Sequence, residues 1–202
     1  MENKVTNWYK EAKESDNDYA KMKDWFEKRT SKHIKSVQEY CQKIQDYDPE
    51  RFSGLVDQAK THDQSKFENP ELDPYIYTTW KYKCKEDGTE FECPDGMDKK
   101  MDEMTEYHVL NKNNRHHPEM HDGRKSGVTN TEDRDAPVTP IIDGTSMLDI
   151  DIAEMIGDWC SVSKERNNTP QAWGKKNINV RWKFTKEQED LIYEVLDAIW
   201  KD

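Results

Sequence analysis

The sequence predicts an all-α protein of about six helices with one long polar loop at about residues 120–146. Apolar residues recur at helical spacing through several long stretches, and residues typical of helix starts precede three of them. Only one short stretch alternates as a strand would. A chain of 202 residues is most simply one domain, residues 1–202, of which residues 1–16 form a polar N-terminal extension.

Composition narrows the classes of function. Hydrophobic residues make up only 33% of the chain, but seven Trp and nine Tyr can each bury a large area, so we expect a folded core. The formal net charge of −11 argues against binding to duplex nucleic acid, which requires a positive surface. No stretch is apolar for long enough to span a bilayer, and no signal-peptide run precedes the helices, so we expect a cytoplasmic protein without membrane contact.

The cysteines give no metal motif. No two of the four lie in a CxxC pair, which argues against a zinc ribbon, and in a cytoplasmic protein we expect reduced thiols. Cys84 and Cys93 flank a turn-like segment and could form a disulfide, so the sequence leaves their pairing open.

The first helix is predicted over residues 18–46. Its apolar stripe consists of Met22, Phe26, Val37, Tyr40, Cys41 and Ile44. His33 falls on the same stripe. Taken alone, it is explained more simply as a core histidine with a polar partner than as a ligand.

A second helix is predicted to begin at Asp48-Pro49-Glu50, with an Asp N-cap and Pro at the first helical position. Its apolar period carries on to His62 and Asp63 at the end of the helix. A His-Asp pair in that place can bind a divalent metal ion. A surface His beside a capping Asp is the simpler alternative.

Another helix is predicted from residue 69 to Tyr82, then a loop over residues 85–98, then a helix over residues 99–112 with His108 near its apolar face. His116 and His117 follow in a loop, because Pro118 ends any helix and biases His117 to an extended conformation. Solvated loop histidines are the alternative to a ligand pair.

After the long loop, which could act as a lid, residues 147–162 predict a helix. Asp151, Glu154 and Asp158 project from one side of it and repel one another unless a cation or a base lies between them. A solvated acidic face is the simpler interpretation. Residues 173–184 alternate and are expected to be extended. Thr185 and Gln188 form a capping box that opens a last helix through Ile199.

Together these residues predict a metal site. Histidine nitrogens with carboxylates suit Mn, Fe, Co, Ni or Zn, as one or two divalent ions, which would bind a phosphate oxygen and lower the pKa of a water molecule. The candidate ligands are His33, His62, Asp63, His108, His116, His117 and Asp158, with Asp63 as the bridging one.

Three further residues are candidates for substrate contacts. Lys66, one turn after Asp63, would stabilise the developing phosphoryl charge, so that Asp63, Lys66 and Glu154 form the predicted catalytic set. Asn111 and Arg115 are second choices for holding phosphate. Glu154 is ambiguous between a ligand, a general base and a surface acid.

The order His33, His62-Asp63, Asp158 on successive helices resembles the HD metal-dependent phosphohydrolase superfamily. The resemblance implies an all-α bundle in which those four residues hold a metal. His62 to Lys66 is similar to the His-Asp-x-x-Lys motif of the cyclic-dinucleotide phosphodiesterase branch, where a lone His and a His-His pair complete a second site. His108 and His116-His117 have that order, but the Gly-Tyr-Pro end of the branch is absent. The resemblance therefore implies the metal chemistry and not the substrate.

A closer likeness is to a little-characterised set of small bacterial and phage proteins. They share His-Asp-x-Ser-Lys-Phe, His-His-Pro-Glu and Glu-Met-x-x-Asp-Trp, found here within residues 62–67, 108–119 and 154–159. The likeness covers roughly residues 30–200 and implies the cytosol of a bacterium or of a phage-infected host.

The first hypothesis is a metal-dependent phosphohydrolase or phosphodiesterase acting on a small phosphorylated substrate: a nucleotide, a cyclic oligonucleotide or a related ester. The alternative is a non-catalytic, metal-stabilised protein that sequesters a nucleotide or a protein partner. A third interpretation is a plain helical domain with structural histidines. The oligomeric state is left open.

Overall fold

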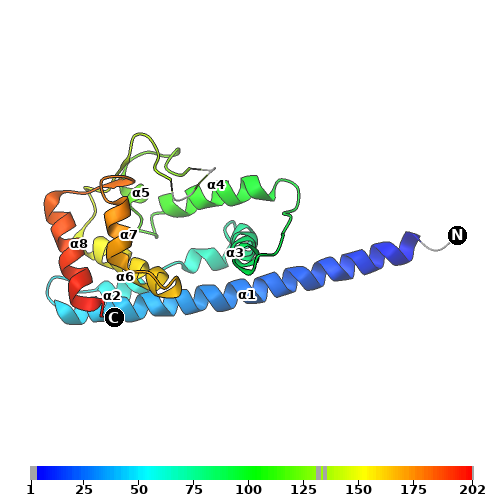
Figure 1. The fold of residues 1–202 in the computed structure, drawn as a ribbon, viewed down its shortest axis with the longest axis horizontal. Helices are drawn as coiled ribbons and strands as arrows, with labels where there is room; N and C mark the ends of the chain where they lie inside the picture. The colour runs from blue at the N-terminus through cyan, green and yellow to red at the C-terminus, as the bar shows by residue number, and fades with distance from the viewer. Residues whose placement is uncertain (1–3, 131–132, 134–135, 202) are drawn as a thin grey trace.

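The protein is all-α. The computed structural model describes residues 4–130, 133 and 136–201, with backbone alone for residues 4–17. This part holds eight α-helices, one short 3-10 helix and two strands of two residues each (Figure 1). The predicted fold class is confirmed, although the sequence predicted about six helices.

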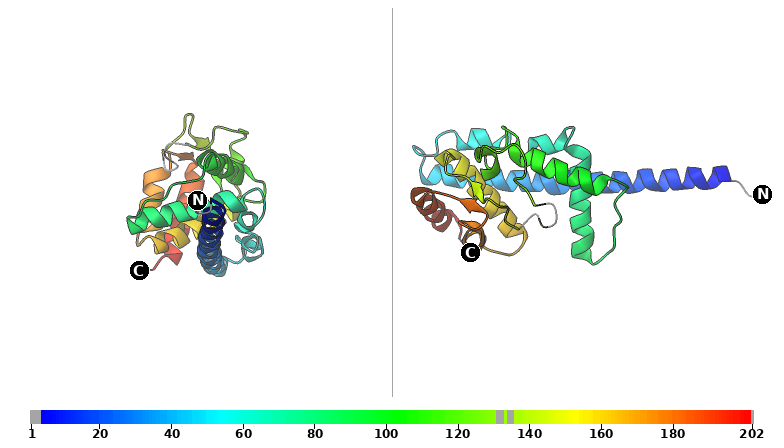
Figure 2. Two further views of the ribbon diagram at one scale, coloured as in Figure 1. Left: turned by 90° about the vertical axis from the view of Figure 1, so that its right-hand side faces the viewer. Right: turned by 90° about the horizontal axis from the view of Figure 1, so that it is seen from above.

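Helix α1 (Lys4–Tyr47) runs along the whole molecule, and its N-terminal part extends beyond the other helices (Figures 1 and 2). The helix predicted over residues 18–46 is confirmed. The residues expected as a separate extension continue the same helix from Lys4. Lys, Glu and Ala are good helix formers, and an existing helix can propagate through them without an apolar face.

The helix predicted to begin at Asp48 does not begin there. The Asp48 side chain accepts a hydrogen bond from the Arg51 N–H at 3.0 Å, as a cap would. Residues 49–54 nevertheless form turns, and the short helix α2 (Leu55–Ala59) starts only after Gly54, whose φ is 88°. Since α2 ends at Ala59, His62 and Asp63 lie in the turn that leads to the 3-10 helix η1 (Gln64–Phe67).

Helices α3 (Leu72–Asp87) and α4 (Met97–Leu110) lie close to their predicted places and pack against each other. Tyr75 and Ile76 of α3 form a small apolar cluster with Met22 and Phe26 of α1. This contact fixes α3 across the middle of α1.

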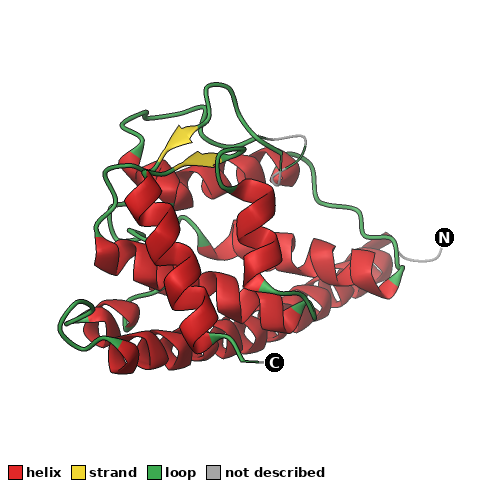
Figure 3. Cartoon of the chain, turned by 60° about the vertical axis from the view of Figure 1, so that its left-hand side comes forward, coloured by secondary structure: helices red, strands yellow, loops and turns green. Residues whose placement is uncertain are grey.

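Pro118 begins a helix instead of ending one, because α5 (Pro118–His121) starts at it. The predicted loop after α5 is largely irregular where described. Its one strand, β1 (Ile142–Asp143), pairs in parallel with β2 (Trp182–Lys183), with Ile142 opposite Trp182 (Figure 3).

Helix α6 (Asp149–Glu165) lies along α1 at the centre of the main core, which also includes α8. The two helices approach closely at Gly157, where a Cβ atom would lie only 2.9 Å from the Cys41 Sγ. Glycine at this position therefore lets Asp158, the next residue, come beside His33 of α1.

The C-terminal part contains α7 (Pro170–Asn177) and α8 (Lys186–Ile199). The capping box is confirmed: the Gln188 N–H donates to the Thr185 hydroxyl, and the Thr185 N–H donates to the Gln188 side chain. The extended segment predicted over residues 173–184 is wrong for its first part. Trp173 belongs to α7, which starts with a Thr169 N-cap and Pro170, a signal that the alternating aromatic pattern obscured.

Two further expectations concern the chain as a whole. Among the described residues, no helix combines the length and the apolar character needed to cross a bilayer. All four cysteines are free thiols, including Cys84 and Cys93.

Candidate metal centre

The centre is built around the turn after α2. The N–H of His62 donates to the carbonyl of Ala59, and Asp63 adopts a left-handed conformation with φ 57° and ψ 9°. Asp is among the few non-glycine residues that adopt this conformation readily. The turn buries both side chains, and neither residue is more than 2% exposed.

Five imidazole rings from four segments form a continuous row. His33 comes from α1, His62 from the turn, His108 from the last turn of α4, and His116 and His117 from the loop before α5. Neighbouring ring centres lie 5.5 Å (His33–His62), 4.2 Å (His62–His116), 4.1 Å (His116–His117) and 5.1 Å (His117–His108) apart. Histidines far apart in the sequence therefore meet at one place.

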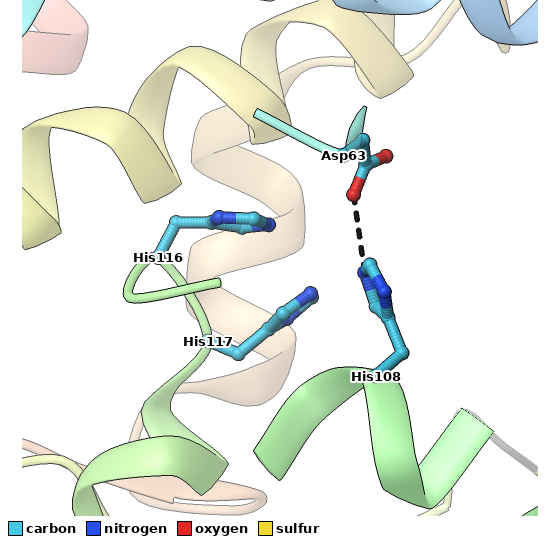
Figure 4. Close-up of side chains that lie close together, drawn as sticks. All are labelled: Asp63, His108, His116 and His117. Carbon is cyan, nitrogen blue, oxygen red and sulfur yellow. Dashed lines mark ion pairs between the residues drawn. The ribbon is translucent and has the colours of Figure 1, made fainter. Parts of the chain in front are cut away.

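The Asp63 carboxylate lies between the two ends of this row. Its Oδ1 is 3.1 Å from the His108 Nε2, and Figure 4 shows His116 and His117 turned toward the same space. Its Oδ2 is 3.6 Å from the His33 Nε2 and 3.8 Å from the His62 Nε2. The two oxygens of one carboxylate thus face two different sets of histidines.

The seven predicted ligands fall into two groups whose candidate ligand atoms lie within 4.8 Å of one another. One contains Asp63, His108, His116 and His117, and the other contains His33, His62 and Asp158. Two ligands bonded to one metal ion at about 2.0–2.2 Å lie about 3 Å apart, close to the separations observed. These groups could hold a metal ion.

Oxygen atoms lie behind three of the rings. The Nδ1 of His108 lies 2.7 Å from a Glu71 oxygen, the Nδ1 of His62 lies 2.8 Å from a Glu154 oxygen, and the Nδ1 of His33 lies 3.1 Å from the Ser161 hydroxyl. An Nδ1–H that donates to oxygen leaves the Nε2 lone pair available, which is the usual arrangement of metal-binding histidines. The sequence therefore supplies ligands and the groups that orient them.

Glu154 serves two rings at once. The Glu154 oxygen next to the Nδ1 of His62 also lies 3.4 Å from the Nδ1 of His116. His62, His116 and Glu154 form a third group of possible ligands. The other Glu154 oxygen accepts a hydrogen bond from the Gln58 side chain at 2.8 Å. The carboxylate thus lies behind two rings, on the side of Nδ1. Its predicted catalytic role stays a prediction.

The buried atoms that face the centre fit a metal ion. Within the described part of the chain, the Nε2 atoms of His62, His108 and His117 and the Oδ1 of Asp63 are buried without a hydrogen-bond partner. Buried polar atoms in proteins are normally paired, and unpaired ones indicate a bound ion or a functional role. If the Nδ1–H of His108 donates to Glu71, its Nε2 and the Asp63 Oδ1, 3.1 Å apart, are two acceptors facing each other, and a cation bound by both removes that conflict.

The electrostatics favour the forms of these groups that bind metal. Burial raises the pKa of Asp63, but the Lys66 ammonium, with His62 and His108, outweighs it and holds the pKa well below its usual value. Burial likewise raises the pKa of Asp158, and the His33 contact lowers it to about 2. Burial holds the pKa of His117 well below its usual value, so this ring is neutral at pH 7. Carboxylates and a neutral imidazole are ready to bind a cation.

A sequence profile of a family of unknown function, DUF5662, matches residues 22–198. The chain belongs to this family. No curated protein and no solved structure matches the chain. The match to DUF5662 covers every candidate ligand from His33 to Asp158, but the family description assigns no activity.

Lys66 of this DUF5662 protein contacts the proposed bridging residue. Its Nζ lies 2.5 Å from the Asp63 Oδ2 and 4.9 Å from the centre of the Tyr75 ring. The ammonium therefore occupies the side of Asp63 that faces His33 and His62. A cation bound there would compete with it for the same oxygen.

Arg115 and Asn111 lie outside the two groups. Arg115 donates two hydrogen bonds to Asp151, both 2.9 Å long, and Asp151 is fully buried. The Asn111 side chain accepts the N–H of Asn113, two residues further on. The Arg115 pair ties the His116-His117 loop to α6, so Arg115 supports the loop, and its predicted role in binding phosphate remains untested.

Replacing Arg115 with Ala should lower the free energy of unfolding by about 1–2 kcal/mol, because buried Asp151 loses its charged partner. Arg51→Ala is a matched control. Arg51 pairs with Asp149, which lies on α6 as Asp151 does, but both side chains of this pair are more than a third exposed. This control should change stability by less than about 1 kcal/mol. Urea unfolding of both variants measures the difference. Equal stability, with weaker phosphate binding in Arg115→Ala alone, would instead favour the substrate role.

Sequence reasoning missed Glu71, Gln58 and Ser161, which orient the rings or the carboxylates behind them. Glu71 lies where the sequence predicts the start of a helix, yet it is 1% exposed just before α3. Its partner His108 is 37 residues away, and no local pattern connects the two.

Proposed function

We propose that this protein is a metal-dependent phosphohydrolase that acts on a nucleotide or a related phosphate ester. The observation that carries the proposal is the position of Asp63, whose two oxygens face two separate sets of histidines. That arrangement is suited to a pair of ions sharing one carboxylate, as in many enzymes that cleave phosphate esters. The order of His33, His62-Asp63 and Asp158 supports a relation to the HD superfamily.

In this proposal His33, His62 and Asp158 would hold one ion, His108, His116 and His117 would hold a second, and Asp63 would serve both. Histidine with carboxylate favours Mn, Fe, Co, Ni or Zn over Mg or Ca. Ions of this kind bind a phosphate oxygen and lower the pKa of a water molecule. Glu71 and Glu154 orient the rings from behind, and the neutral His117 needs to lose no proton before it binds.

Lys66 supplies positive charge beside the reacting phosphate. A cation held at Asp63 would compete with the Lys66 ammonium for the Oδ2, 2.5 Å away, because two positive charges repel each other at one oxygen. The ammonium would then be free to neutralise charge that develops on the phosphoryl group. We accordingly assign Lys66 to catalysis and not to metal binding.

The protein should be freed of metal, reloaded separately with Mn, Fe, Co, Ni or Zn, and assayed for phosphate release from nucleotides and cyclic dinucleotides. Turnover with one of these metals, absent in chelator, supports the hydrolase. Metal binding without turnover on any substrate would favour the alternative, a metal-stabilised binding protein.

Lys66→Met should retain the metal and lower turnover roughly a hundredfold, the size typical of losing one group that stabilises developing charge. Lys60→Met is the control, because Lys60 pairs with Asp57 on the surface, six residues earlier. Rates and metal content should be measured together. Unchanged turnover in Lys66→Met would contradict the assigned role.

A further inference from the structure

A pocket of about 930 Å³ leads from the surface to the candidate metal centre. His116, His117 and Asp158 lie in its wall. The two histidines belong to one group of candidate ligands and Asp158 belongs to the other. Its wall is formed by residues of α6 and α7, of the end of α3, of α4 and α5, of the loop after α5, and of β2. Its volume is near the upper end of the range for small-molecule sites, well beyond what a phosphate group alone needs.

The wall next to the centre is aromatic. Trp159 of α6 and Trp182 of β2 stack with ring centres 5.6 Å apart, and Trp173 of α7 meets Trp182 edge to face at 6.4 Å. All three line the pocket. Such a wall favours a flat apolar body next to the phosphate.

Two of the cations that line the pocket have no ion-pair partner among the described residues. Arg166, at the end of α6, and Lys176, on α7, are exposed and line the pocket, and neither forms an ion pair with another described residue. Lys85 and Arg181 also line it, but Glu86 beside Lys85 offsets that charge, and the Arg181 guanidinium lies over two of the tryptophan rings. In a chain of net charge −11, unpaired cations at the entrance to a metal centre favour an anionic ligand.

We propose that the pocket binds a phosphate ester with an aromatic body and a second anionic group. The phosphate lies at the histidine groups, the aromatic body lies against the tryptophans, and the second anion lies at Arg166 and Lys176. Nucleotides with phosphate at two positions have these features. This inference rests on the proposed function for the position of the reacting phosphate.

Binding to the metal-loaded full-length protein should be measured by calorimetry with matched probes. Phenyl phosphate and biphenyl-4-yl phosphate carry one anionic end. Their para-carboxylated counterparts carry a second at two different distances. At least one carboxylated probe should bind about three- to tenfold more tightly than its parent, as expected for exposed charge pairs, and salt should reduce the gain.

The double variant Arg166→Gln/Lys176→Gln should lose this gain. Lys164→Gln/Lys175→Gln should keep it, because these exposed lysines lie on the same helices but not in the pocket wall. A carboxylate that gives no gain at either length, or a gain that persists without Arg166 and Lys176, would overturn the inference. Phosphate release is scored separately. Hydrolysis without the gain in affinity leaves the proposed function intact. The gain in affinity without hydrolysis, whichever metal is loaded, refutes catalysis alone.

Discussion

If the proposed function holds, replacing Asp63 with Asn is expected to remove both proposed metal ions together and to lower turnover by on the order of a thousandfold or more, since metal ions supply several kcal/mol of transition-state stabilisation. The physical reason is the shared carboxylate: Oδ1 faces His108, and Oδ2 faces His33 and His62. An amide keeps the shape but replaces one oxygen with a nitrogen that does not bind metal. Elemental mass spectrometry and phosphate release measure the two effects.

Asn is the informative substitution here because it also tolerates the left-handed backbone at residue 63, whereas Ala would add strain. Asp57→Asn is the control, since its side chain is 80% exposed and its partner Lys60 lies on the surface. Full metal content and full turnover in Asp63→Asn would refute the shared carboxylate. Loss in both variants would point to a general effect of charge.

Removal of the metal is expected to lower the melting temperature by about 5–10 °C for each site. A ligand at a hundred times its dissociation constant stabilises the folded state by about 2.7 kcal/mol, and 1 kcal/mol shifts a chain of this length by about 2–4 °C. Without a cation, the Nε2 atoms of His62, His108 and His117 stay buried without a partner. Calorimetric melting in chelator and after reloading measures the shift.

Asp63→Asn again provides the control, because its melting temperature should not respond to metal or to chelator. A wild-type melting temperature that is the same with and without metal would favour the third interpretation, in which the histidines are structural. A shift of equal size in the variant would indicate binding at another place.

The long helices could be predicted because a repeated apolar stripe marks them. The stripe from Met22 to Ile44 predicts α1, and the stripe from Leu191 to Ile199 predicts α8. The capping box at Thr185 also predicts where α8 begins. Short helices carry less than two turns of pattern. Helix α2 therefore could not be separated from the turns before it, and the alternating pattern predicts an extended segment at Trp173, which lies in α7.

The candidate ligands could be chosen from the sequence because His and Asp are distinctive and their order resembles a known superfamily. The groups that orient them could not. Glu154 lies 92 residues from His62, and Ser161 lies 128 residues from His33. Such pairs depend on how α1, α4 and α6 pack, and so does the contact of Arg115 with Asp151, which no local pattern indicates.

The most direct test of the shared-carboxylate centre is anomalous diffraction from crystals of the protein loaded with Mn. The account predicts two peaks, one on each side of Asp63: one among His33, His62 and Asp158, the other among His108, His116 and His117. It also predicts that Lys66 no longer contacts the Asp63 Oδ2. Loaded crystals with no peak beside Asp63, and with Lys66 still in contact with it, would contradict the account.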